Sequence, residues 1–298
     1  MKIIDPETID DTALDATNVA ETLAAYNPAT GYTQGQQVRV DSTHHAYESV
    51  LAGTNTGNDP TTDDGTKWLD LGSTNPWAMF DEYLESQTSN ADTIAVTLVP
   101  AGIADAMAFF NLDAATISIT VTDATDGVVY DEDFDLISDV NCGDYYDYCF
   151  QPIIRKTALF VDGLPPYVGP DIDVVIDNTG STAKCGALLM GSLRTLGATV
   201  YGADFGIIDS SRKTTDDFGR TTIVPRSYRK TGNFRVIVDK DYVGEVDRIL
   251  SERRAVFSVF SGTDEYESAL IYGFPRDWRV TLDYPEQSTL NIEIEGVV

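Results

Sequence analysis

Carboxylates are the most abundant chemically active side chains of this sequence. Two dense acidic runs stand out, Asp131-Glu132-Asp133-Phe134-Asp135 and Asp144-Tyr145-Tyr146-Asp147-Tyr148. Two carboxyl groups about 5–10 Å apart can hydrolyse a glycosidic bond, and clustered carboxylate oxygens suit a hard cation such as Ca²⁺. Residues 1–150 hold 27 acidic residues, however, so close carboxylates are expected there by chance, and EF-hand spacing is absent. We expect a solvated acidic surface, with calcium bound between loops as the alternative.

The motifs of common metal, nucleophile and phosphate sites are missing from the sequence. The two histidines, His44 and His45, are adjacent, so on a strand they would point to opposite faces and would not readily chelate one metal. A zinc site would need further Cys or His ligands, and none is nearby. No Gly-x-Ser-x-Gly elbow precedes a helix, and residues 191–197 lack the Gly-Lys-Ser/Thr of a phosphate loop. We therefore expect no metal site, no cofactor and no catalytic residues.

The strongly negative net charge excludes some classes of function. The 298 residues carry 48 acidic and 20 basic side chains, a formal net charge of −28. Nucleic-acid binding needs a dense basic face, so a general DNA- or RNA-binding protein is excluded. No stretch approaches the roughly 18 apolar residues of a membrane-spanning helix, so membrane insertion is not expected. Three cysteines and an acidic N-terminus favour synthesis in a reducing cytoplasm.

The charge is unevenly distributed along the chain. Residues 1–150 contain 3 basic and 27 acidic residues, whereas residues 212–254 contain 11 basic and 7 acidic residues. Opposite charges at two places on one chain can orient identical subunits head to tail. We expect a basic subunit interface that contacts protein; contact with nucleic acid is the competing use, but the acidic remainder of the chain would repel it. Its expected residues are Arg212, Lys213, Arg220, Arg226, Arg229 and Lys230.

Most of the sequence alternates with a period of two residues, which is typical of half-buried strands. Turn-forming clusters such as Asp162-Gly163 and Asp177-Asn178-Thr179-Gly180 separate the strand-like runs. Many short strands joined by turns predict a β-sandwich or jelly roll. The predicted strands cover residues 94–99, 116–121, 128–130, 157–161, 172–176, 185–190, 233–238, 255–260, 279–282 and 289–294.

One segment, residues 241–254, has the spacing of an amphipathic helix. Its apolar positions are Val243, Val246, Ile249 and Leu250. A helix between strand-like runs indicates an α+β unit at the C-terminal end. We therefore predict a mainly β protein with an N-terminal arm (1–25), a small three-stranded module (26–77), a β-sandwich or jelly-roll domain (78–200) and a small α+β assembly domain (201–298).

Residues 26–72 are rich in Thr, Gly and Asp and contain aromatic residues at intervals. A segment this short cannot build a large core, so a few rings must carry its packing. The ordered positions are Tyr26, Tyr32, Gly35, Val38, Tyr47-Glu48 and Trp68. This order resembles the chitin-binding-type carbohydrate modules of families five and twelve, although the stretch 49–54 lacks the further exposed ring of the sugar-binding members. The resemblance implies a three-stranded sheet and suggests glycan binding by Tyr26, Tyr32, Tyr47 and Trp68; simple packing of these rings is the alternative.

Four further motifs extend the resemblance over nearly the whole chain. They are Asn75-Pro76-Trp77-Ala78-Met79-Phe80-Asp81, Tyr201-Gly202-Ala203-Asp204-Phe205-Gly206, the run from Ser211 to Gly219, and Ile294-Glu295-Gly296. Together they resemble structural proteins of tailed bacteriophages. In those proteins a chitin-binding-like module leads, through a strand at the first motif, into a galactose-binding-like jelly roll. The resemblance implies a position in the tail or at its tip.

These features predict a non-enzymatic virion protein of the tail tip, baseplate or a tail appendage, made in the host cytoplasm. The expected partners are copies of itself and other tail or baseplate proteins. Host surface glycans are a further expected ligand, bound weakly at each copy and strengthened by multivalency. The alternatives are a virion enzyme that degrades polysaccharide and a capsid-attached fibre or decoration protein.

Overall fold

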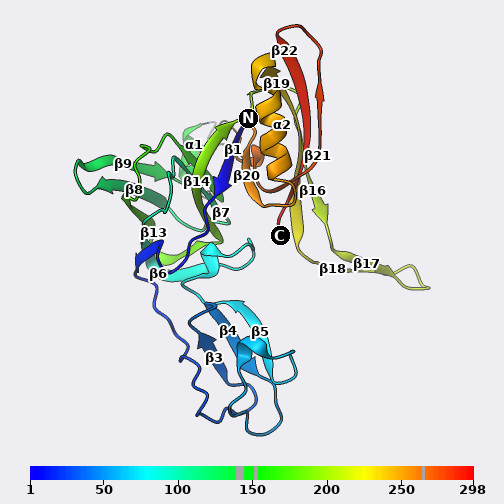
Figure 1. Cartoon of the computed structure of the whole chain (residues 1–298). Coiled ribbons are helices and arrows are strands. Elements are labelled where there is room, and N and C mark those ends of the chain that lie inside the picture. The colour runs from blue at the N-terminus through cyan, green and yellow to red at the C-terminus, as the bar shows by residue number, and fades with distance from the viewer. Residues whose placement is uncertain (139–143, 151–153, 264–265) are drawn as a thin grey trace.

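The computed structural model describes residues 1–138, 144–150, 154–263 and 266–298 of the chain. It confirms a mainly β fold, with 52% of residues in strands and 9% in helices. Figure 1 shows a small module below a body of two larger sheets, and a long hairpin that leaves the body on the side opposite the five-stranded sheet.

The small module is a three-stranded antiparallel sheet at the N-terminal end of the chain. Its strands are β3 (Gln37–Val40), β4 (His45–Ser49) and β5 (Trp68–Ser73). A 3₁₀ helix (Pro60–Thr62) lies between β4 and β5. The strands bury Val38, Tyr47 and Trp68 on one face, so the core of this module consists mainly of aromatic rings.

The second sheet has five antiparallel strands in the order β2-β6-β13-β8-β9. The strands are β2 (Leu14–Thr17), β6 (Thr88–Leu98), β8 (Thr116–Asp123), β9 (Gly127–Asp135) and β13 (Asp171–Cys185). Ile117 and Ile119 of β8 are fully buried, whereas Ser118 and Thr120 beside them are partly exposed. The period-two pattern therefore gives this sheet one apolar inner face and one polar outer face.

The third sheet has ten strands and runs through the whole body. Nine of them form the path β12-β7-β14-β1-β20-β21-β22-β19-β15, and β16 also pairs with β19. The strands are β1 (Lys2–Pro6), β7 (Ala106–Phe110), β12 (Ala158–Asp162), β14 (Ala187–Thr195), β15 (Ala198–Thr199), β16 (Asp204–Asp209), β19 (Tyr228–Asp239), β20 (Ser258–Ser261), β21 (Leu270–Thr281) and β22 (Gln287–Gly296).

The two larger sheets pack face to face over one half of the body. Met107 and Phe109 of β7 and Leu188 of β14 share a core with the inner face of the five-stranded sheet. Over the other half, α2 (Val243–Glu252) covers the ten-stranded sheet, and its Val246 and Ile249 are buried against β19 and β22. The predicted helix at residues 241–254 is confirmed, two residues shorter at each end.

The predicted N-terminal arm (1–25) is not a separate unit, and the predicted boundary at residue 200 does not divide the large sheet. Strand β1, inside the predicted N-terminal arm, pairs with β14 on one side and with β20 on the other. The large sheet is thus continuous from the predicted middle domain into the predicted C-terminal domain. The contact of β1 with β14 is so close that a Cβ atom on Gly191 would lie 1.9 Å from the Asp5 carbonyl oxygen. The pattern of polar and apolar residues within a strand does not indicate which distant strand it pairs with. The sequence therefore did not predict that the large sheet is continuous.

Two local predictions also need correction. Residues 185–190 were predicted as one strand, but β13 ends at Cys185 and β14 begins at Ala187, so the chain passes from one sheet to the other at Gly186. The strand predicted at residues 75–81 is a 3₁₀ helix at Ala78–Phe80, with Met79 fully buried. The remaining elements are β10 (Ile137–Ser138), α1 (Tyr145–Phe150), β11 (Ile154–Arg155), β17 (Arg212–Thr215), β18 (Thr221–Val224) and 3₁₀ helices at Lys240–Tyr242 and Glu267–Ala269.

Candidate interaction surface

The four aromatic rings predicted to bind glycans form the core of the small module. Trp68, Tyr32 and Tyr47 are buried, and Tyr26 is partly buried. The Tyr26 and Trp68 rings lie 5.8 Å apart edge to face, and the Tyr32 and Trp68 rings lie 5.3 Å apart. A sugar needs an exposed ring face on which to stack. The glycan-binding prediction is therefore wrong for Tyr32, Tyr47 and Trp68, and packing, the alternative, is what the structure contains.

Hydrogen bonds fix these rings in place. The indole Nε1 of Trp68 donates to the Asn58 carbonyl oxygen at 2.9 Å, and the Tyr26 hydroxyl donates to the same oxygen at 2.7 Å. One backbone carbonyl thus ties two rings of the core to the loop before β5. The Trp68 Nε1–H and the Tyr26 hydroxyl therefore donate their hydrogen bonds within the module.

The two histidines lie where the module meets the body. The His44 ring stacks on Trp77, with the ring centres 3.7 Å apart, and its Nε2 lies 3.4 Å from an Asp11 oxygen. His45 Nδ1 lies 2.9 Å from an Asp70 oxygen. In the described ranges, no three His, Cys, Asp or Glu side chains are grouped to hold a metal ion. His44 therefore joins the module to the body, whereas His45 pairs with a carboxylate of the module itself.

The two acidic runs differ in their surroundings. Asp131, Asp133 and Asp135 of the first run are exposed on the outer face of the five-stranded sheet. Thr120 donates a hydrogen bond to Asp131 at 3.1 Å, and Ser118 donates one to Asp133. The second run begins at Asp144, directly before α1, and continues into that helix; residues 139–143 before it lie outside the described residues. The first run therefore forms an open surface, not a catalytic cleft.

The reactivity of the thiols also depends on burial. Cys185 is fully buried at the end of β13, and this burial raises the pKa of its thiol to about 12. A thiol with such a high pKa carries almost no thiolate at neutral pH, so it is a poor nucleophile. Cys149 is exposed on α1, and Cys142 lies outside the described residues. Cys185 is therefore a packing residue.

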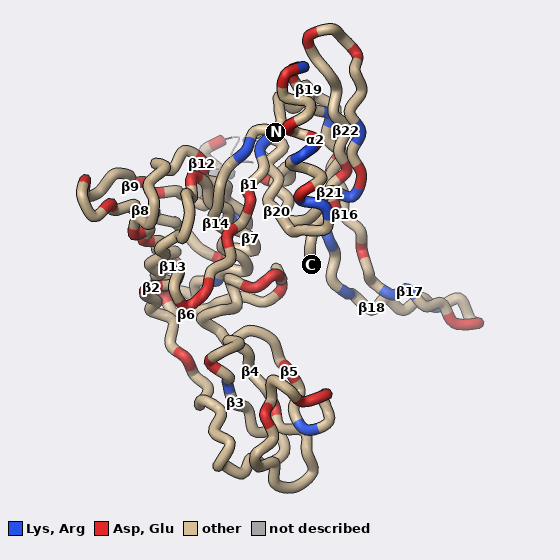
Figure 2. The backbone as a smooth tube through the Cα atoms, in the orientation of Figure 1, with Lys and Arg blue, Asp and Glu red and all other residues tan. Residues whose placement is uncertain are grey.

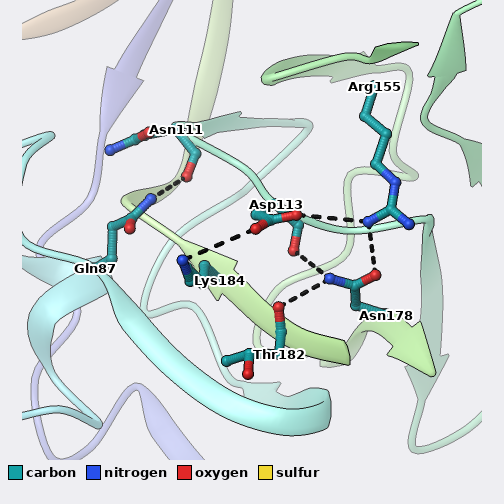
Figure 3. Close-up of polar contacts among 7 residues, drawn as sticks. All are labelled: Gln87, Asn111, Asp113, Arg155, Asn178, Thr182 and Lys184. Atoms are coloured by element: carbon teal, nitrogen blue, oxygen red, sulfur yellow. Dashed lines mark hydrogen bonds and ion pairs between the residues drawn. The ribbon is translucent and has the colours of Figure 1, made fainter. Parts of the chain in front are cut away.

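A buried polar network supports the irregular middle of β13, where its register with β6 shifts between Asp177 and Thr182 (Figure 3). Asn178 is 1% exposed, and its amide nitrogen donates to the carbonyl oxygens of Asp113 at 3.2 Å and Thr182 at 2.8 Å. Its side-chain oxygen accepts a hydrogen bond of 2.6 Å from Arg155. Arg155 and Lys184 also lie 3.5 and 3.9 Å from the Asp113 carboxylate. Because each polar atom of Asn178 already has a partner, the network holds the strand in place.

Replacement of Asn178 with Ala is expected to lower the free energy of unfolding by about 1–3 kcal/mol, because two carbonyl groups and the Arg155 guanidinium lose a buried partner. The neighbouring Thr179 is exposed, so Thr179→Ala should change stability by less than about 0.5 kcal/mol. Urea unfolding followed by circular dichroism measures both variants. Equal effects of the two substitutions would contradict the structural role given to Asn178.

The predicted basic interface lies mostly on the projecting hairpin. Beyond its last residue pair with β22, Thr231 opposite Glu295, β19 continues outward with β16 as its only neighbour among the described strands. After a short join, β17 and β18 extend the hairpin as an isolated two-stranded sheet. We call residues 207–230 the ribbon arm (Figure 1).

The six predicted interface residues divide between the shaft and the base of the ribbon arm. Arg212, Lys213, Arg220 and Arg226 are exposed along the shaft, where Figure 2 shows basic residues between the body and an acidic tip. At the base, Arg229 pairs with Glu295 at 2.8 Å. Lys230 is partly buried and lines a shallow pocket of about 300 Å³ beside the C-terminus. The structure thus brings four of the six predicted residues together on one free element.

The sequence analysis missed the apolar residues of the ribbon arm. These residues are 50–90% exposed: Ile207, Phe218, Ile223, Val224 and Tyr228. An isolated two-stranded hairpin is marginally stable in water, and exposed apolar residues in a group mark an interaction surface. The alternation at residues 212–215 and 221–224 around a turn was the available signal for a hairpin. Nothing local indicated that neither of its faces would be covered.

Similarity to known proteins does not identify the chain: no protein family matches it, and no curated protein matches it. In the part of the chain that the structure describes, no helix is long and apolar enough to cross a membrane. Functional inference therefore rests on the sequence motifs and on the geometry of the exposed surfaces.

Proposed function

We propose that this chain is a non-enzymatic structural protein of a tailed-bacteriophage virion, located at the tail tip, the baseplate or a tail appendage, and assembled with copies of itself and other tail proteins. The resemblance at residues 75–81, 201–206, 211–219 and 294–296 supports the virion assignment. One observation supports assembly above all others: the ribbon arm leaves the body with apolar and basic side chains exposed.

The role in assembly follows from the energetics of the ribbon arm. Burial of an exposed Ile or Phe side chain contributes about 1.5–3 kcal/mol. The ribbon arm presents several such residues and can bury them only against another molecule, because β17 and β18 pair only with each other in the described chain. Exposed cations along the same strands add long-range attraction to an acidic partner.

Host-glycan adhesion is not assigned to the predicted rings. Three of the four are buried in the module core, so they offer no platform for a sugar. The module remains a distinct body joined at His44 and Trp77, and its proposed role is to space or attach the subunit within the tail.

Immunogold labelling of purified phage particles tests the virion assignment. Antibodies raised against the full chain are expected to label the tail of intact particles. Label on the capsid would favour the fibre or decoration alternative, and particles without label would contradict the proposal. A reducing-sugar assay with the purified protein tests the remaining alternative, because sustained release from envelope polysaccharide would make the protein an enzyme.

A further inference from the structure

The outer face of the five-stranded sheet carries a regular array of carboxylates. Its strands place Asp131 and Asp173 on either side of Thr120, and Asp135 and Asp177 on either side of Thr116. Asp133 and Asp171 complete the set. We call these six aspartates, Asp131, Asp133, Asp135, Asp171, Asp173 and Asp177, the acidic face.

Hydroxyl groups in the same sheet orient these carboxylates. Thr97 donates to Asp173 at 2.6 Å, and Thr120 donates to Asp131 at 3.1 Å. The four strand segments that build this face, residues 93–98, 116–122, 128–135 and 171–177, contain no Lys or Arg. These segments therefore supply no cation that could neutralise the six aspartates. Val175, 36% exposed, is the apolar residue at its centre.

The ribbon arm carries the complementary features. Arg212 lies opposite Val224, and Lys213 opposite Ile223, so each face of the shaft pairs a cation with an aliphatic side chain. Such a ribbon fits a surface that presents carboxylates around an aliphatic centre. Strand β9, at the edge of the acidic face, pairs only with β8 among the described strands, so its outer edge is available to a further strand.

The ribbon arm and the acidic face of one molecule do not meet. Figures 1 and 2 show the ribbon arm and the five-stranded sheet on opposite sides of the body. A contact between them therefore joins two molecules. Because it uses different surfaces on the two partners, it is heterologous, and its repetition builds a ring or a filament.

We infer that the ribbon arm of one copy docks on the acidic face of a second copy of this chain. This inference deepens the proposed assembly function and rests on it, because it names the surface that receives the ribbon arm. Contact between apolar side chains supplies the affinity. The opposite charges of the ribbon arm and the acidic face make this face, and not another surface, the binding site.

Charge reversal tests this contact through two variants. The arm variant carries Arg212→Glu, Lys213→Glu and Arg226→Glu; the face variant carries Asp131→Lys, Asp133→Lys and Asp171→Lys. All six side chains are exposed, so both variants should fold. In sedimentation velocity, each variant alone is expected to associate at least about a hundredfold more weakly than the natural chain, since like charges now face one another.

An equimolar mixture of the two variants gives the sharpest result. Each contact in the mixture again joins opposite charges, so alternating copies should assemble although neither variant assembles alone. Control variants with equal changes of charge on exposed sites elsewhere, Arg248→Glu/Arg254→Glu/Arg279→Glu and Asp241→Lys/Glu245→Lys/Asp283→Lys, should assemble like the natural chain.

The outcomes separate this inference from the proposed function. If only the arm variant dissociates, or if the mixture stays monomeric, the ribbon arm docks elsewhere and the inference is wrong while arm-driven assembly stands. If both variants assemble like the natural chain, or if the natural chain is monomeric at every concentration, arm-driven self-assembly itself is wrong.

Discussion

Removal of residues 210–227, the outer part of the ribbon arm, is expected to leave the protein a folded monomer. Residues 210–227 can be replaced by Asn-Gly, because Asp209 lies directly opposite Tyr228 and a two-residue turn closes such a pair. The deletion takes away four exposed cations together with Phe218, Ile223 and Val224. The thermal midpoint should stay close to that of the full chain, since β17 and β18 contact no core. Light scattering coupled to gel filtration measures the mass of both proteins.

The controls for this deletion separate lost assembly from lost structure. Far-UV circular dichroism should show a sheet spectrum reduced only by the two excised strands. A milder variant, Phe218→Ser, removes the most exposed ring at the tip and should retain most of the assembly, because the shaft is intact. If the shortened chain keeps the mass of the natural oligomer, the ribbon arm does not hold the copies together.

Trp68→Ala is expected to unfold the small module while the body stays folded. Trp68 is 2% exposed and contacts both Tyr26 and Tyr32. Truncation of a buried Trp costs about 3–5 kcal/mol. A module with a single cluster of rings has little further core to compensate for this loss. Limited proteolysis with mass mapping should show rapid cleavage within residues 26–72 and slow cleavage elsewhere.

The matched control is Leu69→Ala, one residue further along the same strand. Leu69 points outward and is 49% exposed, so its truncation should leave the proteolysis pattern unchanged. The module core would be wrongly assigned if Trp68→Ala resisted protease as well as Leu69→Ala does. A stable Trp68→Ala variant would also reopen the question of whether the ring serves a ligand.

The strands and the helix of the body could be predicted because their burial is periodic. Ile117, Ile119 and Val121 alternate with polar residues in β8, and Val246, Ile249 and Leu250 recur on one side of α2. Such patterns depend only on which face of an element is buried. The mainly β class follows directly from them.

The partners of these elements could not be predicted in the same way. Strand β1 has five residues, and its Ile3 and Ile4 are buried on opposite faces, so it shows no alternation that would place it in a sheet. Its partners are about 190 and 255 residues away, and no local pattern records a pairing over such a distance. For this reason the sequence did not show that residues 2–6 belong to the large sheet, or that this sheet continues past residue 200.

Exposure was predicted more successfully for the charged candidate residues than for the aromatic ones. An aromatic ring can serve a core or a ligand equally well, and the small size of the module decided for the core at Tyr32 and Trp68. Arginine and lysine are rarely buried, so the exposure of Arg212 and Arg226 was a safe expectation. Apolar residues such as Ile223 would ordinarily be placed in a core, and only the structure shows them on a free hairpin.

A cryo-electron microscopy map of the assembled protein would test the role of the ribbon arm most directly. We expect density for β17 and β18 of every copy that has a neighbour to be in contact with that neighbour. Copies held together through other surfaces, with their hairpins still surrounded by solvent, would contradict the account.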